Sequence, residues 1–290
     1  MNSAKDIAAH IGAERSASDR AEAWRVAALE ATIGKFGRHA APPSLLPPLR
    51  HWLLFPPVYP LEKAGPDGHE LLGAFLPDLG RKRRMWAGSR VRFEAPIALG
   101  DDVSKVSRID AIEEKVGRSG PLVFVRLVHE ISSPAGVAIV EEQDLVFREP
   151  EWSRASAGAT TEAPANPVWI RTVAPDPVML FRYSALTFNS HRIHYDQPYT
   201  TGVESYGGLV VHGPLMATLM ADLAASNFPG RAMRWFRFRG VGPALDTAPI
   251  IVAGGPGDGP SEADLWVAQE GRLCMRANCG FETEASGSNG

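Results

Sequence analysis

Titratable and amide side chains gather in one stretch of the sequence, residues 183–223. This stretch holds three of the chain's eight histidines, His191, His194 and His212, and Asn189 precedes His194 by five positions. A neutral histidine can accept or donate a proton near pH 7, and an asparagine amide can hold a water or a carbonyl oxygen by hydrogen bonds. These residues could instead only pin a loop, but their density beside the start of a helix favours proton-transfer chemistry.

A second chemical element is the sequence that runs from Val210 to Pro214 and leads into an apolar segment. Proline suits the first helical position, which places Gly213 at or near the N-cap. The N–H groups of the first helical turn are then free, and the helix dipole is positive there. A carbonyl oxygen that gains negative charge would be stabilised at this point, as in an oxyanion hole. The simpler alternative is a plain helix start after a strand.

Other kinds of chemistry find little support in the sequence. No glycine-rich nucleotide motif follows a strand, and no G-x-S-x-G elbow occurs. The histidines at 191 and 194 could form a metal pair, but a third ligand at matching spacing is not evident, so we expect no metal and no cofactor. The formal net charge of −3 argues against a broad basic surface for nucleic acid. The basic run at residues 81–84 is either a solvated loop or a contact to ligand phosphates.

The sequence also bears on the compartment of the protein. The N-terminal residues lack the apolar centre of a signal peptide, and no apolar run has the length that spans a bilayer. The two cysteines, Cys274 and Cys279, look like small apolar residues within or beside a strand, which is consistent with a reducing compartment. We therefore expect a cytoplasmic protein without a membrane partner.

The elements that must position the site are expected in two similar halves. In the first, residues 1–20 are polar and expected to be frayed at their start, and Asp19 to Gly34 has helical spacing with Asp19 as a cap. A short helix is expected between Pro48 and Phe55, before a proline pair that ends it. An irregular segment at 61–84 precedes the sheet. Strands are expected at 85–96, 103–112, 122–131 and 137–147.

The second half repeats this plan. The residues after Gly213 place apolar side chains on one face of a helix. Residues 92–99 resemble residues 238–245, half a chain away, which indicates a weak internal repeat. Strands are expected at 168–172, 233–239, 250–254, 263–269 and 273–281.

This order of elements predicts an α+β fold of the double hotdog type, with two antiparallel sheets each wrapped round a central helix. A helix covered by a curled sheet buries the apolar faces of both, and two such units side by side would cover each other's edges. Residues 149–167 are of low complexity and are expected to form a linker. We therefore expect a noncatalytic N-terminal hotdog domain at 1–158 and a catalytic one at 159–290.

The stretch that carries the site resembles the MaoC-like, type-2 enoyl-CoA hydratases and dehydratases, whose motif ends in His-x-Asp. A subgroup with the pattern Leu-Thr-Phe-Asn-x-His-Arg-Ile-His-Tyr-Asp is closer. It includes mitochondrial-type hydroxyacyl-thioester dehydratases and the mesaconyl-C4-CoA and itaconyl-CoA hydratases. The residues that carry the match are Tyr183, Thr187, Phe188, Asn189, His191, Arg192, Ile193, His194 and Asp196, and then residues 209–214. The family's catalytic Asp is Asn189 here.

The resemblance implies roles for the catalytic residues. Gly213 N–H would stabilise an enolate-like oxygen, His194 would be the acid and base that activates water, and Asn189 would orient that water or the imidazole. Because an amide cannot take a proton, His194 is expected to carry it alone. The substrate would be an acyl-CoA thioester, and a homodimer is one open arrangement.

The substrate-binding residues are expected to be Arg192, Tyr195, His212 and Asp196, although Asp196 could instead brace the loop. Arg192 could pair with a second substrate carboxylate, as in a branched C5 dicarboxylyl-CoA, bind a CoA phosphate, or form an ion pair with Asp196. The rival functions are a fatty-acid-type dehydratase, a hotdog thioesterase and a noncatalytic acyl-CoA-binding subunit.

Overall fold

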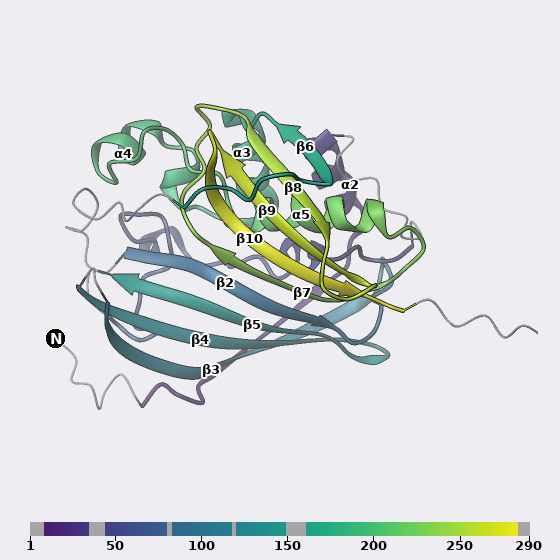
Figure 1. Ribbon diagram of the computed structural model, residues 1–290. Helices are drawn as coiled ribbons and strands as arrows, with labels where there is room; N and C mark the ends of the chain where they lie inside the picture. The colour runs from purple at the N-terminus through teal and green to yellow at the C-terminus, as the bar shows by residue number, and fades with distance from the viewer. Residues whose placement is uncertain (1–8, 35–43, 80–82, 118–119, 149–160, 284–290) are drawn as a thin grey trace, which may run out of the picture.

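The computed structural model describes residues 9–34, 44–79, 83–117, 120–148 and 161–283 (Figure 1). The described strands form one antiparallel sheet of ten strands in the order β1-β3-β4-β5-β2-β7-β10-β9-β8-β6. The strands of the first half are β1 (Glu14–Arg20), β2 (Arg83–Phe93), β3 (Asp102–Gly117), β4 (Gly120–Ser133) and β5 (Gly136–Arg148). Those of the second half are β6 (Trp169–Val173), β7 (Met233–Gly240), β8 (Ile250–Pro256), β9 (Glu262–Gln269) and β10 (Arg272–Phe281).

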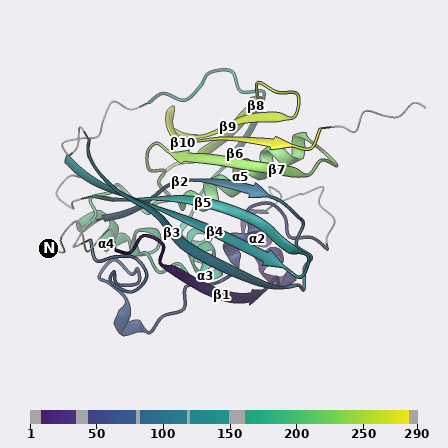
Figure 2. The same cartoon turned by 90° about the horizontal axis from the view of Figure 1, so that it is seen from below.

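The two halves join edge to edge between β2 and β7, where Val91 pairs with Phe236 (Figure 2). Outward from this seam each half has the same strand order, β2-β5-β4-β3-β1 on one side and β7-β10-β9-β8-β6 on the other. The weak repeat of residues 92–99 and 238–245 therefore begins in two equivalent strands. The expected α+β architecture is present, but the two expected sheets are one continuous sheet, because the seam strands satisfy each other's backbone groups.

The helical elements of the first half are short. They are α2 (Ala23–Ile33) and the 3-10 turns η2 (Arg50–Leu53) and η3 (Leu61–Lys63). The second half has α3 (Pro177–Thr187), the 3-10 turn η5 (Arg192–His194), α4 (Gln197–Gly202) and α5 (Gly213–Asn227). The sequence did not predict helix α3. Asp176 is its N-cap, and the Asp176 carboxylate accepts the N–H of Met179, with Pro177 in the first turn.

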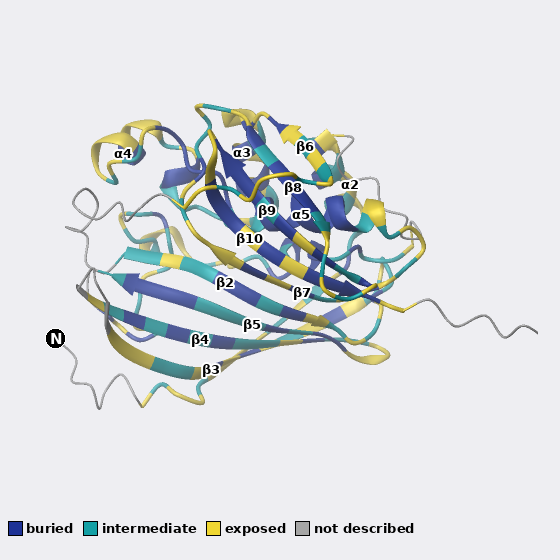
Figure 3. Cartoon of the chain, in the orientation of Figure 1, coloured by how far each residue is buried: buried dark blue, intermediate teal, exposed yellow. Residues whose placement is uncertain are grey.

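Helix α5 is the central helix of the second half and lies against β7–β10 (Figures 1 and 3). Every residue from Leu215 to Ala224 is buried. The residues expected to form the apolar face are therefore buried, and the rest of this stretch is buried too, since α5 lies in a core that also includes side chains of α2 and α3. A helix that is covered on more than one side is mostly apolar all round, and here the buried polar residues are Thr218 and Asp222.

Among the described residues of the first half, no such helix occupies the equivalent position. The bridge Leu45–Ala98 corresponds to the bridge Val210–Leu245, and η2 follows the first as α5 follows the second. The single turn η2 thus stands where a long helix would be. Of the four residues expected to be buried there, Leu49, Leu53 and Phe55 are buried, whereas Trp52 is only partly buried. A short element leaves more of the sheet's surface open to form a cavity.

The described N-terminal residues include a strand that the sequence did not predict. Glu14–Arg20 pairs with β3, whereas the expected frayed start lies at residues 1–8, outside the described residues. Its side chains are mostly exposed, so the sequence carries no alternation of apolar residues. Helix α2 starts after Glu22, and Asp19 instead holds the guanidinium of Arg25 and the N–H of Phe55.

Two further expectations can be compared with the structure only over the described residues. The proposed boundary at 158–159 and most of the linker at 149–167 lie outside them. Within the parts of the chain that the structure describes, no helix has the length and apolar character needed to cross a membrane.

Candidate active site

His194 is buried at the end of η5 and lines a cavity of about 1020 Å³. Its Nδ1 lies 2.7 Å from the carbonyl oxygen of Val210, so Nδ1 carries the proton that is donated there. This leaves Nε2 with a lone pair. Burial lowers the pKa of His194 to about 4, although the Val210 carbonyl acts in the opposite direction. At neutral pH the side chain is therefore an uncharged base.

The imidazole ring of His212 packs against that of His194. The two imidazoles are stacked with 3.7 Å between centroids, and His212 Nε2 lies 2.9 Å from the hydroxyl of Ser184. Burial places the pKa of His212 well below its usual range, with further lowering from His194 and His191. His212 is fully buried and is not among the described residues that line the cavity. Its position suits a residue that orients His194 more than one that touches substrate.

Asn189 lies in the loop that follows α3 and also lines the cavity. Helix α3 ends at Phe188, which adopts a left-handed conformation and turns the chain back. The side-chain oxygen of Asn189 accepts the backbone N–H of His191 at 3.0 Å. The amide nitrogen is then the group that can donate a hydrogen bond to a ligand.

The N-terminus of α5 forms another part of the cavity wall. His212 is the N-cap, and Gly213 is the first helical residue, so α5 begins one position earlier than the sequence predicted. Gly213 and Pro214 both line the cavity. A Cβ at Gly213 would meet only Met275 Cε, at 3.6 Å, so the protein itself leaves room for a side chain. That room lets a ligand oxygen approach the free N–H groups of the first turn.

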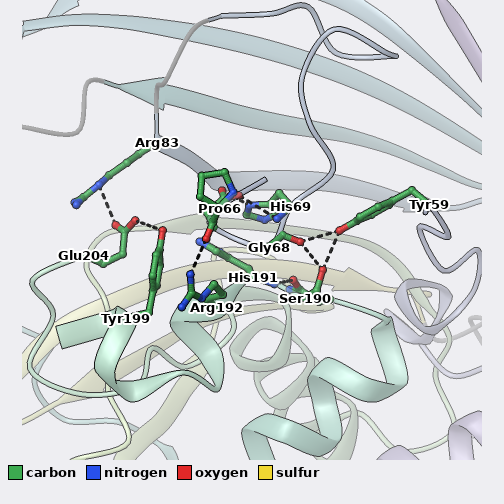
Figure 4. A network of polar contacts seen from close by, with 12 residues as sticks. Tyr59, Pro66, Gly68, His69, Arg83, Ser190, His191, Arg192, Tyr199 and Glu204 are labelled. Atoms are coloured by element: carbon green, nitrogen blue, oxygen red, sulfur yellow. Dashed lines mark hydrogen bonds and ion pairs between the residues drawn. The ribbon is translucent and has the colours of Figure 1, made fainter. Parts of the chain in front are cut away.

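The remaining predicted site residues brace the loop. Arg192 forms an ion pair with Asp196 at 2.7 Å. Its guanidinium lies over the ring of Tyr199, beside which Arg192 is drawn in Figure 4. Asp196 also caps α4 by accepting the N–H of Tyr199, and the Tyr195 hydroxyl donates to the carbonyl of Ser190. Arg192, Tyr195 and Asp196 are not among the described cavity-lining residues. Of the alternatives for Arg192, the ion pair with Asp196 is the one present.

A loop of the first half, residues 66–69, is hydrogen-bonded to residues 190–192 of the loop that follows α3 (Figure 4). The backbone N–H of Arg192 donates to the carbonyl of Asp67, and its guanidinium donates to the carbonyl of Pro66. The Ser190 hydroxyl donates to the carbonyl of Gly68. Gly68 has φ of +91°, and a Cβ there would lie 1.9 Å from the carbonyl oxygen of Ser190. Only glycine allows so close a contact, so both halves build the site.

This loop brings His69 and Asp67 into the cavity wall, which sequence analysis did not foresee. His69 Nδ1 lies 2.8 Å from Asp67, and the ring of His69 lies 4.1 Å from that of His191. Burial is the main cause that lowers the pKa of His191 to about 2 and also lowers that of His69. The three side chains could offer metal ligand atoms within 4.8 Å of one another, but the charge of nearby Arg84 disfavours a cation.

The rest of the cavity wall is largely apolar. The apolar side chains contributed by the first half include Leu72, Phe75, Leu76, Trp86, Leu127 and Leu145. The cavity thus joins a polar end, with His194 and the start of α5, to an apolar wall. This combination fits an elongated ligand with one reactive polar group.

The fold and the site define a hotdog protein of hydratase type. Residues 49–246 match the family model for hydroxyacyl-thioester dehydratase type 2. The chain is 41% identical over 254 residues to mesaconyl-C(4)-CoA hydratase of Chloroflexus aurantiacus, which covers 88% of this chain and 90% of the relative. The chain therefore belongs to the hydroxyacyl-thioester dehydratase type 2 family and is a hydro-lyase.

Solved structures agree on the fold. HtdX of Mycobacterium tuberculosis superposes with a TM-score of 0.67 at 20% identity, covering 91% of this chain and 98% of HtdX. Another Mycobacterium tuberculosis protein, described as having a double hotdog fold, matches with a TM-score of 0.56 at 13% identity over 94% of this chain and 96% of its own. The predicted double hotdog is thereby confirmed.

Proposed function

We propose that the protein adds water across the double bond of an enoyl-CoA thioester, or catalyses the reverse dehydration. The preferred acyl group is a branched C5 dicarboxylyl group of the mesaconyl or itaconyl kind. The observation that carries the chemistry is the unprotonated Nε2 of His194 in a cavity that also contains the free N–H groups at the start of α5. The acyl group is supported by the 41% identity to a mesaconyl-C(4)-CoA hydratase.

In this proposal the thioester carbonyl accepts hydrogen bonds from the first turn of α5 at Gly213. A water molecule lies between His194 Nε2 and the Asn189 amide. His194 takes a proton from the water while the water oxygen bonds to the β-carbon. The electron pair of the double bond moves toward the carbonyl oxygen, where the helix N-terminus stabilises the enolate. His194 then returns the proton to the α-carbon, so the net change is the addition of one water.

Asn189 acts in this scheme as a hydrogen-bond donor. Its oxygen is engaged with the N–H of His191, so its nitrogen can hold the water oxygen with a lone pair aimed at the substrate. A single proton carrier is sufficient, because the proton taken from water is the one delivered to carbon. Arg192, Tyr195 and Asp196 hold the loop that presents His194, and His212 fixes the plane of its ring.

Purified protein tests this function with a set of enoyl-CoA thioesters. Loss of the conjugated thioester absorbance is followed for mesaconyl-C4-CoA, itaconyl-CoA and crotonyl-CoA, and the products are weighed by mass spectrometry. Hydration adds the mass of one water and retains CoA. Release of free CoA would instead support a hotdog thioesterase, in which water attacks the carbonyl. Equal rates on crotonyl-CoA and the dicarboxylyl thioesters would contradict the proposed acyl group.

Three wider expectations stay proposals. The first is the division into a hotdog domain at 1–158 and a catalytic domain at 159–290. Contacts of Asp67 and His69 with the catalytic loop make the first domain part of the site wall. The others are a cytoplasmic location and a homodimer, which cell fractionation and light scattering would test.

A further inference from the structure

Arg84 differs from the other cations near the cavity. It lies in β2, is half-buried, and lines the cavity. Among the described residues no hydrogen bond or ion pair engages its guanidinium. Its neighbours are paired, since Arg83 contacts Glu204 at 2.9 Å and Arg15 contacts Glu70 at 2.9 Å. Arg272 also lacks an ion pair among the described residues, but it is exposed.

The surroundings of Arg84 leave its charge poorly balanced. Burial lowers its pKa even though Asp67, Tyr59 and Glu70 act in the opposite direction. Asp67 is already bonded to His69, and Glu70 to Arg15. A half-buried guanidinium without an ion pair among the described residues has lost part of its hydration, and no partner replaces it. Such a group gains most when a ligand supplies a carboxylate or a phosphate.

The position of Arg84 ties it to the reacting end of the cavity. Arg84 lines the same cavity as His69, His191 and His194, and its charge lowers the pKa of His69 and His191. The ring of His191 is 5.4 Å from that of His194. An acyl group held beside His194 therefore shares this cavity with the Arg84 side chain. A C5 dicarboxylyl group carries its second carboxylate within a few bonds of the double bond.

We propose that Arg84 binds the free carboxylate of the acyl group and so selects dicarboxylyl thioesters. This inference rests on the proposed hydratase function. It gives to Arg84 the contact with a second substrate carboxylate that the sequence suggested for Arg192. The planar guanidinium can donate two parallel hydrogen bonds to a carboxylate, which lysine cannot reproduce. A phosphate of CoA has similar chemistry, so the test must separate the two sources of negative charge.

The experiment compares Arg84→Met with the wild type on three kinds of substrate. These are the dicarboxylyl-CoA thioesters, crotonyl-CoA, and N-acetylcysteamine thioesters of the same acids, which carry no phosphate. Arg84→Met should lower kcat/KM for the dicarboxylyl substrates by about 10- to 100-fold with either carrier. Activity on crotonyl-CoA should stay within about 3-fold, which also shows that the variant folds. For the dicarboxylyl substrates, the kcat/KM of Arg84→Lys should lie between that of the wild type and that of Arg84→Met.

The matched control is Arg92→Met. Arg92 lies in the same strand, is exposed, and pairs with Glu94 outside the cavity. The Arg92→Met variant should keep the wild-type kcat/KM for all three kinds of substrate. An equal loss on dicarboxylyl-CoA and crotonyl-CoA that disappears with N-acetylcysteamine would assign Arg84 to a CoA phosphate instead. No selective loss would overturn the inference while leaving the hydratase intact. A wild type inactive on the whole set would overturn the proposed function itself.

Discussion

The imidazole rings of His194 and His212 lie stacked, with 3.7 Å between centroids and planes 18° apart. Each ring has one fixed partner, the Val210 carbonyl for His194 and the Ser184 hydroxyl for His212. Both rings are buried and uncharged at neutral pH, since their pKa values are lowered by burial. The stack therefore presents one neutral base to the cavity in a defined orientation.

Replacement of that base should remove most of the activity. His194→Ala is expected to lower kcat by about 10²- to 10⁴-fold, because no other side chain in the proposed mechanism carries the proton. The measurement is the steady-state hydration rate, with circular dichroism to show an unchanged fold. His10→Ala, a histidine away from the cavity wall, is the control. Near-wild-type turnover in His194→Ala would rule out the proposed acid–base role.

The pH dependence should follow the same residue. Since the pKa of His194 is lowered to about 4, activity should persist at pH 5 and fall only as the pH approaches 4. An unperturbed histidine would lose half of its basic form near pH 6.5. The measurement is kcat/KM against pH in buffers of constant ionic strength. An acid limb near pH 6.5 would show that the ring is more hydrated than its burial implies.

The stability of the protein should fall at low pH, because these histidines are buried in the uncharged form. In the unfolded chain these histidines bind protons below about pH 6.5, whereas the folded chain binds them only at lower pH. Unfolding then takes up protons, so stability is full above about pH 6.5 and falls as pH drops toward the folded pKa. For His194 the slope is about 1.4 kcal/mol per pH unit down to its pKa of about 4. Urea unfolding of wild type and His194→Gln at several pH values measures it, and an unchanged slope in the variant would contradict this assignment.

A buried ion pair joins the first half to α5. Arg50, in η2, is fully buried and binds Asp222 through both guanidinium nitrogens, at 2.6 and 2.9 Å, and also Glu30. Asp222→Asn should lower the free energy of unfolding by about 3–5 kcal/mol, because it leaves a buried cation poorly compensated. Urea denaturation measures this change. Arg92→Met, which removes an exposed pair, should shift it by no more than about 0.5 kcal/mol. Similar effects of the two variants would contradict a structural role for the buried pair.

How much of the molecule the sequence predicts depends on how local each signal is. The meander strands and α5 follow from apolar periodicity and turns, and the loop with Asn189 and His194 is contiguous in the chain. Strand β1 was missed because its polar residues pair only through the backbone. His69 and Arg84 were missed as site residues because a long-range contact brings them there. For Arg84, the only sequence feature that indicated a ligand contact was the basic run at residues 81–84.

That long-range contact can be tested at Gly68. In Gly68→Ala the added Cβ would overlap the carbonyl oxygen of Ser190 at 1.9 Å, and φ of +91° is strained for alanine. The loop with Asp67 and His69 should then move off the catalytic loop, and kcat/KM should fall by at least about 10-fold, as expected for misplaced site groups. Gly100→Ala is the matched control, since Gly100 has φ of +101° but nothing within 4 Å of the added carbon. It should lose stability from backbone strain alone and keep its kcat/KM. Equal activity in the two variants would show that the contact between the halves does not position the site.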